Sequence, residues 1–331
     1  MADALLEKRN KLLRFFPVPR YLALGAVSCF IDYDMFRFIE LVPRGSNMII
    51  RKYGNVALPS AVTDDADEIS PDIKKIVEKT IADKKIRSTT IVLPERLVYV
   101  FFITIPIVEQ NFIHDALAFK LEEHIPIPPG DVMFEFNIMK RDERAKTMTI
   151  AVRAVPQKQV EKYIDFFTSL GVLVAGCETE GQSALLSALP LTDNLCRLVI
   201  KIGARGTLIF IAQGRSILFS SSISFGGGDI LGLDKESLPI LNSIKDEAKK
   251  IIEYWNSRPD ADNTSQAESI LLFGRVAEYS GVKEYFEAAL SYPAEIANVW
   301  QNAFSLEKNI PTIEAKDATD MAPVIGLSLL Q

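Results

Sequence analysis

Residues 196–229 have the sequence CRLVIKIGARGTLIFIAQGRSILFSSSISFGGGD, which contains three apolar segments separated by short turns with glycines. Alternating apolar stretches with glycine between them are typical of antiparallel strands joined by tight turns. We therefore expect a meander of three strands over 196–203, 207–212 and 216–224. Gly203 and Gly206 in its first turn would let backbone N–H groups approach an anion closely.

The first half of the chain contains a similar meander. Strands are predicted over 21–30, 35–42 and 48–53, with a polar turn at 44–47. Residues 41–46, LVPRGS, match the cleavage sequence of a thrombin linker, but strand-like apolar sequence continues on both sides and favours a native hairpin. A helix over 70–85 and a buried strand over 88–93 follow. Two halves that begin alike predict an α/β protein with two related domains.

A segment of different composition begins near residue 97 and predicts an inserted subdomain of order β-α-β-β-α. Its first helix, over 109–124, is expected to turn Phe112, Ala116, Phe119 and Leu121 inward, and it ends at the proline-rich sequence IPIPPGD. The remaining elements are expected over 132–140, 148–155 and 158–170.

Composition narrows the classes of function. The 331 residues are 48% hydrophobic and 24% charged, with 37 Lys and Arg against 43 Asp and Glu, a net charge of −6. Such a charge gives no overall attraction to nucleic acid. Cys29, Cys177 and Cys196 lie in apolar runs, so we expect three buried thiols in a reducing compartment, and with two histidines they offer no zinc-ligand spacing. With no apolar run of membrane-spanning length and no secretory signal, the sequence predicts a soluble cytoplasmic protein.

The first 17 residues form a separate unit, predicted as a basic amphipathic helix. Its apolar stripe is Leu5, Leu6, Leu12, Leu13 and Phe16, beside Lys8, Arg9, Lys11 and Arg14. Two interpretations are open: the helix packs on its own domain, or it contacts a membrane surface or a partner.

Seven segments in order make the chain resemble the PilM family, actin-like cytoplasmic proteins of type IV pilus assembly that are related to FtsA. The most specific is ALAFKLEEHIPIPPGDVMFEFNIM at 116–139. The others are FRFIEL, KYGNVALP, IVLPERLVYVFFITIP, AVPQKQVEKYIDFFTSLGV, LVIKIGARGTLIFIAQGRSILFSSSISFGGGDI and MAPVIGLSLL.

The resemblance implies an α/β, actin-like two-domain fold of the actin, heat-shock chaperone and sugar-kinase type, with an inserted 1C subdomain. It divides the chain into an N-terminal helix (1–17), a first part of domain 1A (18–96), subdomain 1C (97–175), a return to 1A (176–193), domain 2 with parts 2A and 2B (194–317), and a C-terminal helix that returns to 1A (318–331).

In such folds two turns hold the nucleotide phosphates, and each carries an aspartate for magnesium. The resemblance aligns Phe30 with the first aspartate and Lys201 with the second, so both acids are replaced. The segment next to the adenosine, which usually has two or three consecutive glycines, keeps one, Gly274. Phe273 and Arg275 are expected to fill the space that adenine would occupy. The degenerate nucleotide-binding candidates are Asp32, Asp34, Arg37, Lys201, Gly203, Gly206, Thr207 and Gly274.

These replacements predict that ATP and magnesium are disfavoured as cofactors and that the protein has no catalytic residue and no metal ligand. The alternative is a shifted register in which Asp32 or Asp34 holds magnesium. In that case the protein would be a nucleotide-dependent actin-like ATPase.

The resemblance also implies a partner, an inner-membrane assembly protein of PilN type, whose N-terminal peptide would bind between the first domain and 1C. Candidates for that groove are Leu121, Ile125, Pro126, Ile127 and Pro128. The implied function is a cytoplasmic scaffold and pseudo-ATPase at the inner face of the cytoplasmic membrane, with self-association as a further option. A cytoplasmic scaffold of a type II secretion system is the other alternative.

Overall fold

The computed structural model describes residues 26–44, 47–59, 62, 68–224, 226–227, 230, 236–258, 266–307 and 310–330. The helix predicted over 1–17 lies outside these ranges, as do Gly228 and Asp229. Within the described part of the chain, no helix is long and apolar enough to cross a membrane.

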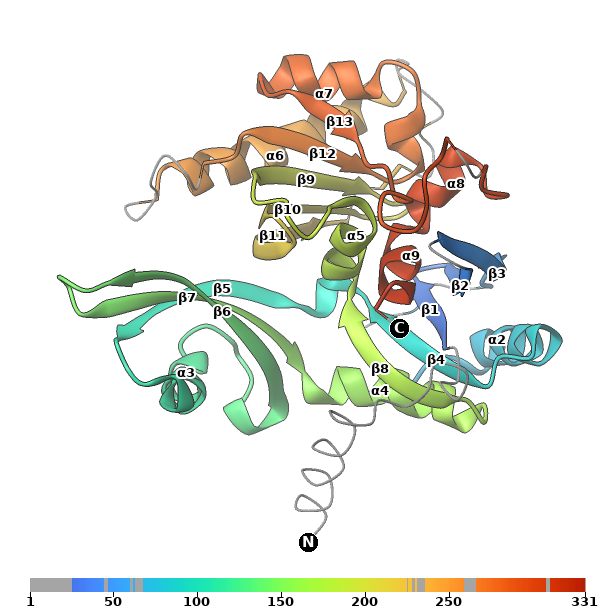
Figure 1. The fold of residues 1–331 in the computed structure, drawn as a ribbon, viewed down its shortest axis with the longest axis horizontal. Helices are drawn as coiled ribbons and strands as arrows, with labels where there is room; N and C mark the ends of the chain where they lie inside the picture. The colour runs from blue at the N-terminus through green and yellow to red at the C-terminus, as the bar shows by residue number, and fades with distance from the viewer. Residues whose placement is uncertain are drawn as a thin grey trace, which may run out of the picture.

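Two five-stranded sheets have the same strand order and confirm the two related halves (Figure 1). In each sheet an antiparallel meander is extended by two strands parallel to its first strand. The first sheet has the order β3-β2-β1-β4-β8, with β1 Val27–Asp32, β2 Met35–Arg44, β3 Asn47–Ala57, β4 Ser88–Leu93 and β8 Leu173–Thr179. The second has the order β11-β10-β9-β12-β13, with β9 Cys196–Ile202, β10 Thr207–Gln213, β11 Ser216–Ile223, β12 Ser269–Phe273 and β13 Ala294–Ile296.

Helices cover the outer face of each sheet with apolar side chains. Below the first sheet, α2 (Pro71–Lys84) begins at the N-cap Ser70 and buries Ile73, Val77 and Ile81, and α4 (Gln157–Ser169) joins the same core. On the second sheet lie α6 (Leu238–Asn256) and α7 (Val282–Leu290). We call these two units the first lobe and the second lobe.

Two small-residue helices, α5 (Glu180–Ala188) and α9 (Ala322–Ser328), lie between the two sheets (Figure 1). They pack so closely that a side chain in place of Gly326 would overlap the carbonyl oxygen of Ser183. The C-terminal segment thus returns to the first lobe, since Ser328 Oγ accepts a hydrogen bond from Leu41 N at 3.1 Å. The remaining short helices are α8 (Ala315–Asp320), η1 (Glu95–Leu97), η2 (Gln110–Phe112), η3 (Pro129–Asp131) and η4 (Arg275–Glu278).

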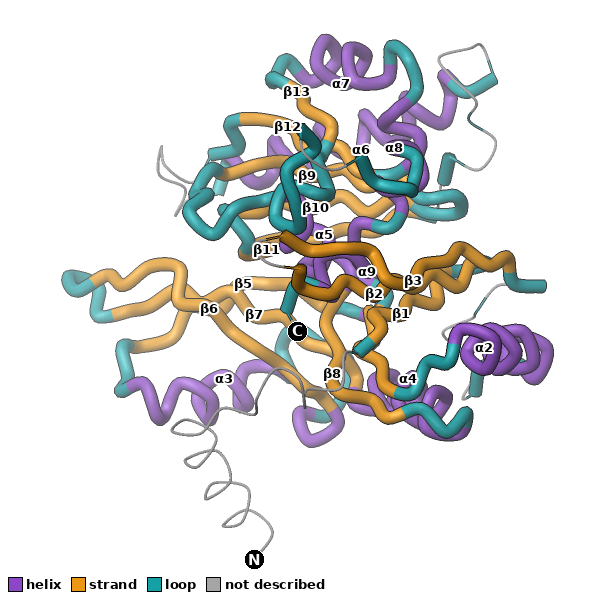
Figure 2. Tube along the Cα trace, turned by 45° about the vertical axis from the view of Figure 1, so that its right-hand side comes forward, coloured by secondary structure: helices purple, strands orange, loops and turns teal. Residues whose placement is uncertain are grey.

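A three-stranded sheet between β4 and α4 forms what we call the insert. Its order is β5-β7-β6, with β5 Tyr99–Pro106, β6 Val132–Asp142 and β7 Thr147–Pro156, and α3 (Ile113–Leu121) covers the face turned away from the second lobe (Figure 2). The following α4, which the sequence interpretation placed within 97–175, packs with the first sheet, as does β8, which was expected to lead out of that subdomain.

The predicted inward side of the helix over 109–124 was wrong for two residues. Phe112 is 58% exposed and Phe119 is 85% exposed. The regular helix begins only at Ile113 and buries Ile113, Leu117 and Leu121, which are four residues apart. Phe112 and Phe119 therefore lie on its outer side.

The expectation of three buried thiols was also wrong for one residue. Cys29 and Cys196 are buried, whereas Cys177 is exposed. The reason is its strand: β8 is the last strand of the first sheet, and Ala175, Gly176 and Cys177 are all exposed along it. On the two sides of residues 45–46, Arg44 and Asn47 face each other in the β2–β3 ladder.

Candidate functional site

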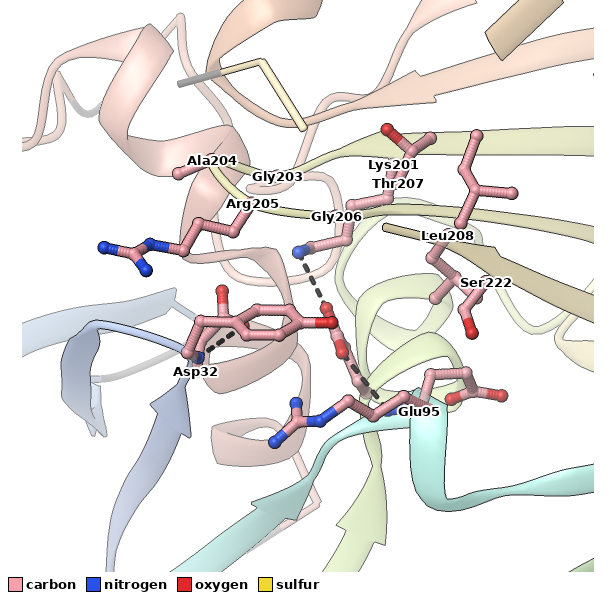
Figure 3. Close-up of a pocket in the computed structure, with 14 residues that line it drawn as sticks. Asp32, Glu95, Lys201, Gly203, Ala204, Arg205, Gly206, Thr207, Leu208 and Ser222 are labelled. Atoms are coloured by element: carbon pink, nitrogen blue, oxygen red, sulfur yellow. Dashed lines mark hydrogen bonds and ion pairs between the residues drawn. The ribbon is translucent and has the colours of Figure 1, made fainter. Parts of the chain in front are cut away.

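The two predicted phosphate turns face each other across the space between the lobes (Figure 3). The first joins β1 to β2 through Tyr33 and Asp34, and the second joins β9 to β10 through residues 203–206. Together with Glu95, Arg96 and Glu180, these turns line a cavity of about 40 Å³. Sites for drug-sized ligands usually measure about 300–1,000 Å³, so the space is small.

Asp32, at the end of β1, is held by a cation of its own lobe. Its carboxylate accepts a hydrogen bond from Arg37 Nη1 at 2.9 Å, and the side chains are 14% and 6% exposed. Burial alone would raise the pKa of Asp32, but the positive charges of Arg37 and Lys201 outweigh it and hold this pKa below its ordinary value. Asp32 is therefore an ionised carboxylate already paired within the chain.

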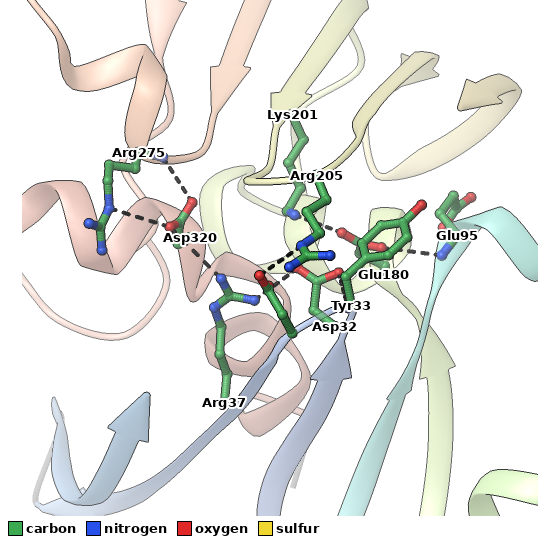
Figure 4. Close-up of polar contacts among 10 residues, drawn as sticks. Asp32, Tyr33, Arg37, Glu95, Glu180, Lys201, Arg205, Arg275 and Asp320 are labelled. Atoms are coloured by element: carbon green, nitrogen blue, oxygen red, sulfur yellow. Dashed lines mark hydrogen bonds and ion pairs between the residues drawn. The ribbon is translucent and has the colours of Figure 1, made fainter. Parts of the chain in front are cut away.

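Lys201, at the position aligned with the second magnesium aspartate, is paired in the same way. Its Nζ lies 2.7 Å from Glu180 Oε1, and the side chains are 5% and 11% exposed. Burial would lower the pKa of Lys201, but the carboxylates of Glu180 and Asp32 raise it. The ammonium thus stays charged and contacts a carboxylate at the start of α5 (Figure 4).

Glu95, directly after β4, is a second buried acid beside Glu180. Its Oε2 accepts a hydrogen bond from Gly181 N at 2.8 Å, and its own N–H donates to Glu180 Oε2 at 3.2 Å. Burial, together with the nearby Glu180 charge, raises the pKa of Glu95 to about 7. Glu95 Oε1 is buried without a hydrogen-bond partner, in line with the burial that raises this pKa.

Sequence reasoning missed Glu95 and Glu180. Each follows the carboxyl end of a parallel strand, β4 or β8, where open α/β sheets usually place functional side chains. An acid just after a predicted buried strand was the signal that could have found them.

Contacts between the two turns bring the lobes together. Asp34 accepts a hydrogen bond from Arg205 Nε at 2.9 Å, and this pair joins residues 171 positions apart. The Tyr33 ring lies against Gly206, where an added Cβ would be 3.3 Å from the ring, and Arg96 covers that ring at 4.6 Å. A tyrosine therefore occupies the position next to the glycine that was expected to approach a phosphate.

The second turn keeps its shape. Gly203 N donates to Gly206 O at 2.9 Å, and Thr207 is buried as the first residue of β10. The predicted cradle of Gly203, Gly206 and Thr207 is thus brought together with Asp32 and Lys201 around one cavity. Asp34 does not line that cavity but pairs with Arg205, which does.

Gly274 and its neighbours form a separate group at the end of β12. Gly274 has a φ of +93°, and a side chain there would overlap the carbonyl oxygen of Ile202. Phe273 is fully buried in the core between the lobes. The Arg275 side chain pairs with Asp317. Its backbone N–H donates to Asp320 Oδ1 at 2.9 Å (Figure 4).

The five groove candidates do not form one exposed surface. Leu121 and Ile125 are 0% and 2% exposed within the core of the insert, and Ile127 packs against that core. Pro126 and Pro128 are exposed. The two buried residues therefore belong to the core of the insert.

The arrangement of two related lobes around a central cleft is the actin-like ATPase fold, as the comparisons with solved structures show. The chain is similar to a chain of a PilM-PilN type IV pilus biogenesis complex, with a TM-score of 0.70, 16% identity, and coverage of 94% of this chain and 98% of that one. MreB 5 of Spiroplasma citri bound to AMPPNP gives a TM-score of 0.51 at 12% identity, over 92% of this chain and 95% of that one. Ethanolamine utilization protein EutJ from Carboxydothermus hydrogenoformans gives 0.50 at 11% identity, over 97% and 96%. No family model and no curated protein matches the sequence.

Proposed function

We propose that this protein is a cytoplasmic scaffold of type IV pilus assembly that binds a peptide of an inner-membrane partner of PilN type and works without nucleotide. The similarity to a chain of a PilM-PilN complex over 94% of the chain carries this proposal. The scaffold would work at the inner face of the cytoplasmic membrane, where its partner is anchored.

The residues of the cleft support a function without nucleotide, because they do not fit a magnesium–nucleotide complex. Phe30, at the position aligned with the first magnesium ligand, is fully buried in the core between the lobes. Lys201 and Asp32 are each satisfied by a partner from the chain itself. A triphosphate would have to break both ion pairs and displace Tyr33 from Gly206.

The outer edge of β8 is the surface that best suits the partner peptide. Among the described strands, β8 has one neighbour, β4, so its other edge is open to an added strand. Leu173 is 61% exposed, and Ala175, Gly176 and Cys177 are exposed beside it. An extended peptide can add to such an edge through main-chain hydrogen bonds, with side-chain contacts for specificity.

Ion pairs hold this edge in place relative to the insert. Arg153 of β7 lies 2.9 Å from Glu135 of β6, 3.9 Å from Glu178 of β8, and donates to Gln182 Oε1 at 2.8 Å. The same carboxylates would attract a basic residue of the peptide. A peptide on the β8 edge would thus meet both the first lobe and the insert.

Alkylation of Cys177 tests the β8 edge on the full-length protein. Cys29 and Cys196 are buried, and burial raises the pKa of their thiols to about 12 and about 11, so N-ethylmaleimide should modify Cys177 selectively. We expect the modified protein to bind a synthetic PilN-type N-terminal peptide at least about tenfold more weakly, a loss of roughly 1.4 kcal/mol. The matched control is Cys177→Ser treated with the same reagent, which should bind like the untreated protein. Equal binding by the modified protein and this control would refute the β8 assignment.

A further inference from the structure

Two exposed phenylalanines lie on the outer side of α3 and of η2, the short helix that leads into it. Phe112 is 58% exposed and Phe119 is 85% exposed. They are seven residues apart, about two helical turns, so they lie on one side of the helix. Soluble proteins rarely leave large apolar side chains grouped on one face unless that face binds something. We call Phe112 and Phe119 the α3 face.

Acidic residues surround this face. Glu109, Asp115, Glu122 and Glu123 are exposed on α3 or beside it. Of these, Glu123 is 2.6 Å from Lys120 Nζ, and Asp115 is 3.8 Å from His114 Nδ1. The negative charge disfavours an anionic lipid surface and favours a basic, apolar peptide.

The chain itself contains a segment of this chemistry. Residues 5–16, LLEKRNKLLRFF, contain Lys8, Arg9, Lys11 and Arg14 against the one acid Glu7, and six of the remaining residues are Leu or Phe. This segment precedes Ala26, where the described structure begins immediately before β1. The ten peptide steps from residue 16 to residue 26 can span about 33–36 Å, roughly the width of a domain.

We propose that the α3 face is the docking site for residues 5–16 of the same chain. Docking would cover both phenylalanine rings with leucine and phenylalanine side chains and place basic residues beside Asp115 and Glu122. The α3 face and the β8 edge are on different elements, so this proposal does not depend on the peptide proposed for β8.

Site-specific photocrosslinking in the full-length protein tests the docking. Benzoylphenylalanine at position 119 should crosslink within one chain to residues 5–16, as mapped by mass spectrometry of the monomer. The matched control carries the same group at Tyr254, an aromatic residue of α6 that is 54% exposed. It should give no crosslink to residues 5–16.

Charge reversal adds a readout that chance proximity would not produce. Glu122→Lys should lower the crosslinking yield by up to about fivefold, and Arg14→Glu in the same protein should restore it. Glu122 is exposed, and circular dichroism of both variants should show an unchanged fold.

Three results would overturn the proposal. The first is that crosslinks from position 119 do not reach residues 5–16, and the second is that positions 119 and 254 give equal yields. The third is that crosslinks are found only in dimers, which would assign the face to a second copy of the chain. Co-sedimentation with anionic vesicles that requires residues 1–17, in the absence of the crosslink, would assign the segment to lipid instead.

Discussion

The Lys201–Glu180 ion pair offers a quantitative test of the cleft. Lys201 Nζ lies 2.7 Å from Glu180 Oε1, with side chains only 5% and 11% exposed, and Asp32 and Glu95 lie in the same cavity. Lys201→Met would leave the carboxylate of Glu180 buried without its cation. Removing one partner of a buried ion pair costs about 3–5 kcal/mol, so we expect a loss of that size in the free energy of unfolding.

A double-mutant cycle separates this pair from other effects of the substitutions. Glu180→Gln keeps the size of the side chain but removes its charge, and the variant with both changes leaves neither charge. We expect the double variant to lose about 1–3 kcal/mol less than the sum of the single losses, because the pair interacts directly. Urea unfolding at neutral pH, followed by the fluorescence of the buried Trp255 and Trp300, measures the four stabilities.

Additive losses in this cycle would refute the reasoning. They would mean that Lys201 and Glu180 do not stabilise each other, and the cavity would then offer a free cation for phosphate. A loss below about 1 kcal/mol for Lys201→Met would contradict the burial argument in the same way.

Three further predictions concern the same cleft. Because burial raises the pKa of Glu95 to about 7 from an ordinary 4.5, the folded state holds the proton more tightly than the unfolded state, and stability should fall as pH rises between these values. The difference in melting temperature between pH 5 and pH 8 should therefore be smaller for Glu95→Gln than for the unchanged protein. Arg205→Ala should change the free energy of unfolding by no more than about 1 kcal/mol, since Arg205 is 55% exposed, and a larger loss in urea unfolding would contradict a surface pair. Magnesium-ATP should leave the melting temperature unchanged and produce no ATPase activity above background, and a turnover abolished by Lys201→Ala would contradict this.

The sequence predicted the parts of the fold that local patterns determine. The strand over 88–93 and the meander after Cys196 were confirmed, because alternating apolar residues and glycine turns are local signals. Strand β13, with three residues, was missed because its pairing with β12 depends on contacts distant in sequence. The exposed sides of α3 and β8 were not predicted either, because a single sequence does not show which apolar face lacks a neighbour.

Only the part of the candidate site that follows from a local sequence pattern was predicted. Asp32, Lys201, Gly203 and Gly206 follow from the turn pattern, and the structure brings them together. Their partners do not follow from it, since Glu180 comes from α5, which follows β8, and Asp320 from a helix near the C-terminus. Only the folded chain places these carboxylates next to the cations of the turns.

The charge balance of the cleft argues for lobes that close without a ligand. Each of the cations Arg37, Lys201 and Arg275 has a carboxylate of the chain as its partner, from Asp32, Glu180, and Asp317 with Asp320. In a site built for a triphosphate, such cations would repel one another until the bound anion compensated them. Here the protein supplies the compensating charges, and Asp34 with Arg205 joins the two turns directly. These ion pairs within the chain therefore stabilise this arrangement of the lobes, as the proposed scaffold with a fixed binding surface would require.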